Sequence, residues 1–266
     1  MPKVHVERVG AVAVVAFDNP PMGYLDAAVV AELDAVTAGV AADDAVRAVV
    51  FTSRIPGVFI RHYDVAELSA LSRNLRAKGR TFIEERLAPE RPLDGVFARL
   101  ETMPKAAIAA IDGIAMGGGF EFCLACDIRI AARGPYTLGQ PEINIGILAG
   151  AGGTQRLARV VGPARALEMS LRGRVVTPDE AASIGMVHEA VDGSAFDRAM
   201  EIAAECARKP PRATGHIKRL IRLAHETPLS RGLALERTLF LDLAVSDEAA
   251  ALMETMVRDG RDIRDM

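Results

Sequence analysis

The sequence predicts an α/β protein with parallel strands. Three observations support this prediction: short β-branched segments, helical segments between them, and a final stretch that is helical only. A strand–helix–strand order at this spacing favours parallel pairing, because the helix carries the chain back to the end of the sheet where the first strand began. The change of segment type predicts two parts, residues 1–200 with strands and helices and residues 201–266 with helices alone.

The first part of the chain shows the clearest elements. Residues 4–10 and 11–17 are β-branched segments that meet at a glycine, which predicts a hairpin. Residues 26–40 carry apolar side chains at helical spacing, and Asp26 is placed to cap that helix. The continuous apolar segment 47–52 predicts a strand that is buried on both faces.

The same order of elements continues, without a period strict enough to establish a repeat protein. Further strands are predicted over 106–111, 128–132 and 187–191. Further helices are predicted over 117–126 and 178–184, and four more, separated by proline-containing breaks, over 196–207, 213–223, 230–243 and 247–257.

Residues 70–95 differ from the rest of the chain, because a cluster of basic side chains is followed there by two prolines. The cluster consists of Arg73, Arg76, Lys78 and Arg80. The simpler interpretation is a solvated excursion from the fold. The alternative is a basic rim that attracts a phosphate-bearing ligand.

Composition excludes several classes of protein. With 50% hydrophobic and 25% charged residues, the 266-residue chain is neither disordered nor a disulfide scaffold, and its three cysteines favour a reducing compartment. A net charge of −3 supplies no strong attraction toward nucleic acid. No window approaches the ~20 apolar residues of a membrane span, and residues 1–8 contain no apolar signal region. We therefore expect a cytoplasmic protein that binds neither nucleic acid nor a membrane.

A glycine-rich turn is the first segment that can carry chemistry. An apolar strand leads into Gly117, Gly118 and Gly119, and Glu121 follows on the helix that these glycines open. Glycine lets the backbone approach a ligand closely, and the first N–H groups of a helix have no intrahelical acceptor. Such N–H groups can stabilise a developing oxyanion. Taken alone, a triple glycine is better explained as a tight turn that packs a helix on a sheet.

A second segment places a carboxylate among apolar residues. Glu142 lies between a proline and an isoleucine, where partial desolvation would raise its pKa and favour acid–base chemistry. The following segment, 150–156, reads Gly-Ala-Gly-Gly-Thr-Gln-Arg. It lacks the Lys-Ser/Thr ending of a phosphate-binding loop and is a weak nucleotide signal. Cys123 and Cys126 have no second cysteine pair, so we expect no metal site.

Together these segments resemble the crotonase superfamily of enoyl-CoA hydratases and isomerases. The resemblance rests on Gly-Gly-Gly-x-Glu from 117, Cys-Asp from 126, Gly-Gln-Pro-Glu from 139 and Gly-Ala-Gly-Gly-Thr-Gln-Arg-Leu from 150. It implies an α/β fold made of a spiral of ββα repeats, with the acyl-CoA site in 1–200 and a C-terminal helical trimerisation region in 201–266. It also implies an acyl-CoA thioester as substrate, a homotrimer or homohexamer as assembly, and no cofactor, because coenzyme A is part of the substrate.

The resemblance further implies roles for individual residues. The backbone N–H groups of Tyr63 and Gly118 are expected to form an oxyanion hole for a thioester enolate. Glu121 is expected to hold and activate a water molecule, and Glu142 to exchange the proton at the α-carbon. Gly150 matches a glycine that lies near this water.

One loop departs from the family pattern, in which a small residue precedes the aspartate. This chain instead reads Arg61-His62-Tyr63-Asp64, with bulk where the coenzyme A moiety usually passes. The bulk either narrows the acyl pocket, adds a polar contact or abolishes ordinary hydratase turnover; alternatively, the side chains pack away from the site. Candidate substrate-binding residues are therefore Arg61, His62, Asp64, Gly117 and Gly150.

Three functions follow, in order of preference. The first is hydration of a 2-enoyl-CoA, supported by the presence of both Glu121 and Glu142. The second is another crotonase reaction, a double-bond isomerisation or a racemase-type proton shift, supported by the altered loop before Asp64. The third is a non-catalytic protein that binds coenzyme A or RNA, which the acidic balance of the chain and the two glutamates disfavour.

Overall fold

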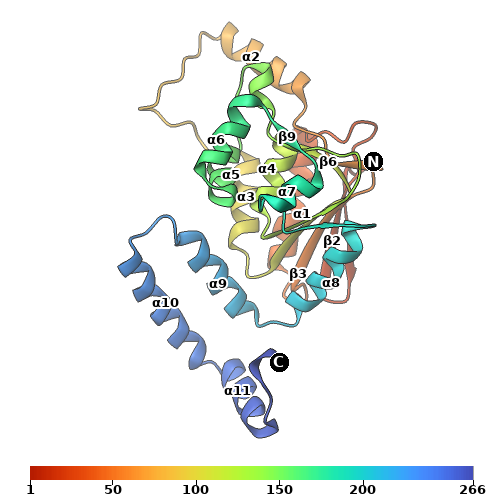
Figure 1. The fold of residues 1–266 in the computed structure, drawn as a ribbon. Coiled ribbons are helices and arrows are strands. Elements are labelled where there is room, and N and C mark those ends of the chain that lie inside the picture. The colour runs from red at the N-terminus through yellow and green to blue at the C-terminus, as the bar shows by residue number, and fades with distance from the viewer. Residues whose placement is uncertain (266) are drawn as a thin grey trace. The chain divides into compact units, whose positions relative to one another are not determined.

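The computed structural model describes residues 1–265 and divides the chain into two compact units (Figure 1). The first unit is Met1–Ala207 and the second begins at Arg208. The expected division at residue 200 falls inside helix α8 (Ala195–Ala207). Because α8 packs its alanine face on the larger sheet of the first unit, the whole helix belongs to that unit and the boundary lies at its end.

The larger sheet of the first unit has the strand order β1-β2-β3-β5-β7-β10. Its strands are β1 (Val4–Val9), β2 (Val12–Phe17), β3 (Ala48–Ser53), β5 (Ala106–Ile111), β7 (Ile128–Ala132) and β10 (Glu189–Val191). The expected hairpin of β1 and β2 is confirmed, and the other neighbouring strands pair in parallel, as predicted. Successive residues of β5, such as Ala107 and Ile108, belong to cores on opposite faces of the sheet, which explains its continuous apolar sequence.

A smaller sheet has the order β4-β6-β8-β9. Its strands are β4 (Gly57–Ile60), β6 (Gly113–Met116), β8 (Leu138–Gly139) and β9 (Val175–Val176). The sequence does not predict these strands, because two to four residues are too few to show a period. In β3–β4, β5–β6 and β7–β8 the chain passes each time from the larger sheet to the smaller one. The expected spiral of ββα units is thereby confirmed.

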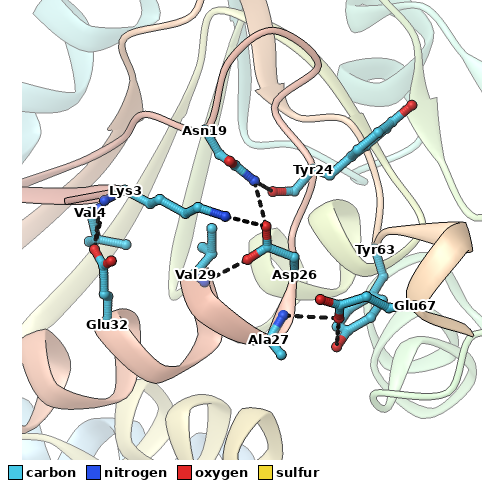
Figure 2. A network of polar contacts seen from close by, with 10 residues as sticks. All are labelled: Lys3, Val4, Asn19, Tyr24, Asp26, Ala27, Val29, Glu32, Tyr63 and Glu67. Atoms are coloured by element: carbon cyan, nitrogen blue, oxygen red, sulfur yellow. Dashed lines mark hydrogen bonds and ion pairs between the residues drawn. The ribbon is translucent and has the colours of Figure 1, made fainter. Parts of the chain in front are cut away.

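The helices of the first unit cover both faces of the larger sheet (Figure 1). Besides α8 they are α1 (Ala27–Ala42), α2 (Val65–Ala77), α3 (Pro92–Thr102), α4 (Gly118–Ala125), α5 (Gly153–Val161), α6 (Pro163–Arg172) and α7 (Pro178–Ser183). The cap predicted for α1 is confirmed, since Oδ1 of Asp26 accepts a hydrogen bond from the Val29 N–H at 2.8 Å (Figure 2). The sequence does not predict α2, α3, α5 and α6.

The segment with the basic cluster is partly helical. Its first half belongs to α2, and α3 begins at Pro92. Residues 78–91 between them form neither helix nor strand, and all of them are exposed. The interpretation as a solvated excursion is confirmed for 78–91, while the basic rim stays a prediction.

An aromatic cluster joins the two sheets and two helices of the first unit. The Phe122 ring of α4 lies 5.3 Å from Phe17 of β2 and 4.9 Å from Phe51 of β3, between ring centres. Phe59 of β4 and Phe97 of α3 contact the same ring, at 6.2 and 6.0 Å. The cluster therefore fixes α4, which carries Glu121, against the rest of the core.

The second unit consists of helices, as predicted. They are α9 (Pro211–Leu223), α10 (Leu229–Ala244) and α11 (Asp247–Asp259), followed by the short 3-10 helix η2 (Ile263–Asp265). Several large apolar side chains of this unit are exposed, among them Ile221, Phe240 and Val257. A role in trimerisation stays a prediction. Within residues 1–265, none of the helices combines the length and the apolar composition that a bilayer span needs.

Candidate active site

A cavity of about 530 Å³ opens in the first unit among α1, α2, α3 and the start of α4. It is lined by most of the predicted site residues, namely His62, Tyr63, Gly117, Gly118, Glu121, Glu142 and Gly150. The remaining lining is mainly apolar and includes Val30, Leu68 and Leu93. A mostly apolar cavity with a few converging polar groups is the usual form of a small-molecule site.

Two predicted substrate-binding residues, Arg61 and Asp64, do not line this cavity. The Arg61 Nε donates a hydrogen bond to the Met22 carbonyl at 3.1 Å. The Asp64 carboxylate caps α2 by accepting from the Ala66 N–H at 2.7 Å. Both side chains therefore stabilise the backbone around the site, and their predicted contact with the substrate stays a prediction.

The two predicted N–H donors lie close together. Tyr63 follows β4, and Gly118 is the first residue of α4, one residue beyond the one that follows β6. Strands β4 and β6 are parallel neighbours, so the residues after them meet; a Cβ placed on Gly118 would lie 3.5 Å from the Tyr63 nitrogen. The N–H of Asp64, the residue after Tyr63, is bonded to the Leu25 carbonyl at 2.8 Å, but no residue within 1–265 accepts a hydrogen bond from the backbone N–H of Tyr63 or of Gly118. Both N–H groups are thus left for a ligand.

Each glycine of the turn occupies its position for a different physical reason. Gly117 adopts a left-handed conformation with φ of 49°, and a Cβ there would lie 3.3 Å from Oε1 of Glu142. A Cβ on Gly119 would lie 2.2 Å from the Ile60 carbonyl oxygen, so α4 packs on β4 only through glycine. Gly118, between them, lines the cavity.

Glu121 is buried and held at one carboxylate oxygen. Its Oε1 accepts hydrogen bonds from the Ala151 N–H at 2.6 Å and from the Gly153 N–H at 2.8 Å. Burial raises the pKa of Glu121, and the two N–H groups oppose that rise by stabilising the charged form. The geometry orients the carboxyl and leaves Oε2 without a bond to the protein among the contacts of residues 1–265.

Two arginines hold the loop that orients Glu121. Arg91, the residue before α3, donates from Nη2 to the Gly150 carbonyl at 2.6 Å. Arg156 of α5 donates from Nη1 to the Ala151 carbonyl at 2.9 Å and pairs through Nε with Glu101 of α3 at 2.7 Å. The sequence predicts no role for either arginine, although Arg156 belongs to the Gly-Gly-Thr-Gln-Arg segment on which the family resemblance rests.

Glu142 is the second carboxyl of the site. It begins the 3-10 helix η1 (Glu142–Ile145), and its Oε2 is buried without a hydrogen-bond partner in the described chain. Burial, together with the nearby Glu121 carboxylate, raises the pKa of Glu142 to about 7. This rise in the pKa of Glu142 agrees with the desolvation that the sequence predicts. A carboxyl with this pKa can give or take a proton near neutral pH.

His62 borders the cavity in a restrained position. Its ring packs on Tyr24, with 4.8 Å between ring centres, and its Nδ1 donates to the Tyr63 carbonyl at 2.7 Å. No group of three or more His, Cys, Asp or Glu side chains within residues 1–265 is placed to hold a metal ion. The site therefore consists of two carboxyls, two backbone N–H groups and an apolar wall.

Comparisons with known proteins agree with this architecture. The model of the enoyl-CoA hydratase/isomerase family matches residues 7–258. The short-chain-enoyl-CoA hydratase of Clostridium acetobutylicum is 34% identical over 241 residues, which cover 89% of this chain and 87% of that protein. A probable enoyl-CoA hydratase of Bacillus subtilis is 33% identical over 245 residues, covering 90% and 89%. The structure of DspI from Pseudomonas aeruginosa superimposes with a TM-score of 0.86 and 32% identity, covering 98% of this chain and 96% of that one. The chain therefore belongs to the enoyl-CoA hydratase/isomerase family.

Proposed function

We propose that the protein adds water across the 2,3-double bond of a 2-enoyl-CoA thioester. The observation that carries the proposal is the convergence of two buried carboxyls, Glu121 and Glu142, and two free backbone N–H groups on one cavity. The relatives named enoyl-CoA hydratase support the same reaction. Coenzyme A enters as part of the substrate, and hydration needs no redox cofactor because it involves no net oxidation.

The N–H groups of Tyr63 and Gly118 are proposed to bind the thioester oxygen. Attack at C3 moves negative charge onto this oxygen, and two preorganised donors stabilise that charge as it develops. Loss of one donor of this kind typically costs ~2.7–4 kcal/mol of transition-state stabilisation. Because both donors belong to the backbone, substituting the side chains does not remove them.

The two carboxyls are proposed to divide the proton transfers. Glu121, with Oε1 held by the loop after residue 150, orients a water molecule and takes one of its protons as the oxygen bonds to C3. Glu142 gives its proton to C2, so that hydrogen and hydroxyl add to the same face. The two carboxyls thus carry one proton between them before and after the reaction. The reaction leaves that proton on Glu121, and exchange with solvent returns the pair to its starting state with the proton on Glu142.

Mass spectrometry of the products tests the proposal. Purified protein is incubated with short, medium and branched 2-enoyl-CoA thioesters, beside the Glu142→Gln variant. Addition of one water by the wild type, but not by the variant, is the expected result. If no thioester gains water, hydration is wrong, and exchange of deuterium from heavy water at C2 or C4 then identifies the second candidate, a double-bond shift or another proton transfer.

A further inference from the structure

Tyr63 lines the cavity, and its backbone N–H is one of the two proposed oxyanion donors. Its phenol O–H donates a hydrogen bond to Oε2 of Glu67 on α2 at 2.9 Å (Figure 2). The proposed mechanism uses only the backbone of Tyr63. Neither the ring nor Glu67 has a part in the acid–base steps.

Glu67 connects Tyr63 to a second helix. The same Oε2 accepts a hydrogen bond from the N–H of Ala27, the first residue of α1, at 3.0 Å (Figure 2). A carboxylate is favoured at a helix N-terminus because the first N–H groups and the helix dipole stabilise its charge. Burial and the Glu67 carboxylate raise the pKa of Tyr63 to about 12, so the phenol remains a donor at physiological pH. The ring is therefore attached at both ends.

The walls around the ring are apolar. Ala27 and Val30 of α1, and Val65 and Leu68 of α2, line the same cavity. When a thioester oxygen binds the Tyr63 N–H, the first carbons of the acyl chain lie within reach of the ring. The ring cannot turn out of their path without giving up its bond to Glu67, which makes its volume a fixed part of the wall.

We propose that Tyr63, held in place by Glu67, is a specificity-determining residue that limits the acyl group to short chains. The inference rests on the proposed function, because that function assigns the thioester oxygen to the Tyr63 N–H. It goes beyond that function by naming the substrate class and the side chain that selects it. Tyr63 and Glu67 act here through shape and not through proton transfer.

The test compares kcat/KM for 2-butenoyl-, 2-hexenoyl-, 2-octenoyl- and 2-decenoyl-CoA in matched variants. Tyr63→Ala removes the ring, and the ratio of 2-octenoyl- to 2-butenoyl-CoA is expected to rise by about tenfold or more, since each methylene newly buried favours binding by about fourfold. Glu67→Ala releases the ring and shifts the ratio in the same direction by less. Glu67→Gln keeps an oxygen that accepts both hydrogen bonds, so it retains the wild-type ratio.

Two results would overturn the inference. A Tyr63→Ala ratio within twofold of the wild type shows that the ring limits nothing, since a merely structural role would lower every kcat/KM alike. Equal ratios in Glu67→Ala and Glu67→Gln show that Glu67 does not hold the ring. Calorimetric binding of the saturated butanoyl- and octanoyl-CoA thioesters gives the same ratio without turnover. If the wild type hydrates none of the thioesters, the proposed function fails, and the binding ratio still decides the inference.

Discussion

Glu142 holds its proton close to neutral pH because its carboxyl is buried, lacks a partner at Oε2 and faces the Glu121 carboxylate. In the proposed mechanism the two carboxyls are active with one proton between them, and they lose this proton as the pH rises through the pKa of Glu142, about 7. We expect kcat/KM for hydration to fall above that pH, by about tenfold per pH unit. A stopped-flow profile at constant ionic strength checks this. A rate that stays level to about pH 9 contradicts it.

Gly117 gives a second prediction for a single residue. A methyl group there meets Oε1 of Glu142 at 3.3 Å on a left-handed backbone. Gly117→Ala is expected to lower the free energy of unfolding by about 1–2 kcal/mol and to lower kcat, because Glu142 must move. Gly39→Ala is the matched control, since a methyl group there, within α1, meets nothing within 4 Å. Urea unfolding and kcat, measured on both variants, separate the two positions; equal kcat values would disprove the effect on Glu142.

Among the single residues, the positions that line the cavity were easier to predict than the partners of individual side chains. The glycine turn, Glu121 and Glu142 follow from a motif in which position along the chain determines placement. Arg61 and Asp64 belong to an equally distinctive stretch, yet their side chains serve the Met22 carbonyl and the cap of α2. The direction of a side chain depends on backbone geometry and on partners far along the sequence, which one sequence does not display.

Helix α3 supports the loop that holds Oε1 of Glu121, because Glu101 of α3 pairs with Arg156, which donates to the Ala151 carbonyl. Arg156 lowers the pKa of Glu121, so its removal raises that pKa. In Arg156→Met we expect the acidic limb of the pH–rate profile to move to higher pH and kcat to fall by about tenfold or more as the loop loosens. Arg156→Lys keeps the charge but not the bidentate pair with Glu101. We therefore expect its acidic limb to lie close to that of the wild type, while its kcat stays low.

The control for this experiment is Arg159→Met, an exposed arginine on the same helix. Arg159→Met is expected to match the wild type in both the acidic limb of the pH–rate profile and kcat. If Arg156→Met also behaves like the wild type, the support by α3 has no catalytic role, and Arg156 serves packing alone.

Strands with a continuous apolar sequence were predicted well, whereas elements that depend on tertiary contacts were predicted poorly. The strands of the larger sheet are buried on both faces and show as apolar runs, whereas β8 and β9 have two residues each. A strand of two residues exists because β6 and its neighbours hold it, not because its own sequence favours it. Helix α3 depends in the same way on tertiary contacts, through buried residues such as Val96 and Phe97.

For the first unit as a whole, the Phe122 ring is the central contact between the two sheets. Phe122 is fully buried, and its removal leaves a cavity between sheets and helices that cannot collapse independently. Phe122→Ala is expected to lower the free energy of unfolding by about 3–5 kcal/mol. Phe82→Ala is the control, because Phe82 is 63% exposed and its loss should change stability by less than about 0.5 kcal/mol. Denaturant titration compares them, and equal midpoints would contradict the central role of Phe122.

The neighbouring ends of β4 and β6 have a consequence for how this chain can change over evolutionary time. Both proposed oxyanion donors belong to the main chain, at Tyr63 and Gly118, so no replacement of Tyr63 by another residue except proline deletes a donor. The side chain of residue 63 can therefore change the shape of the cavity without removing the backbone N–H of the same residue, which is the group proposed to polarise the ligand. A lineage carrying this fold can drift at residue 63, sampling new ligands one substitution at a time, while its chemistry is inherited unchanged.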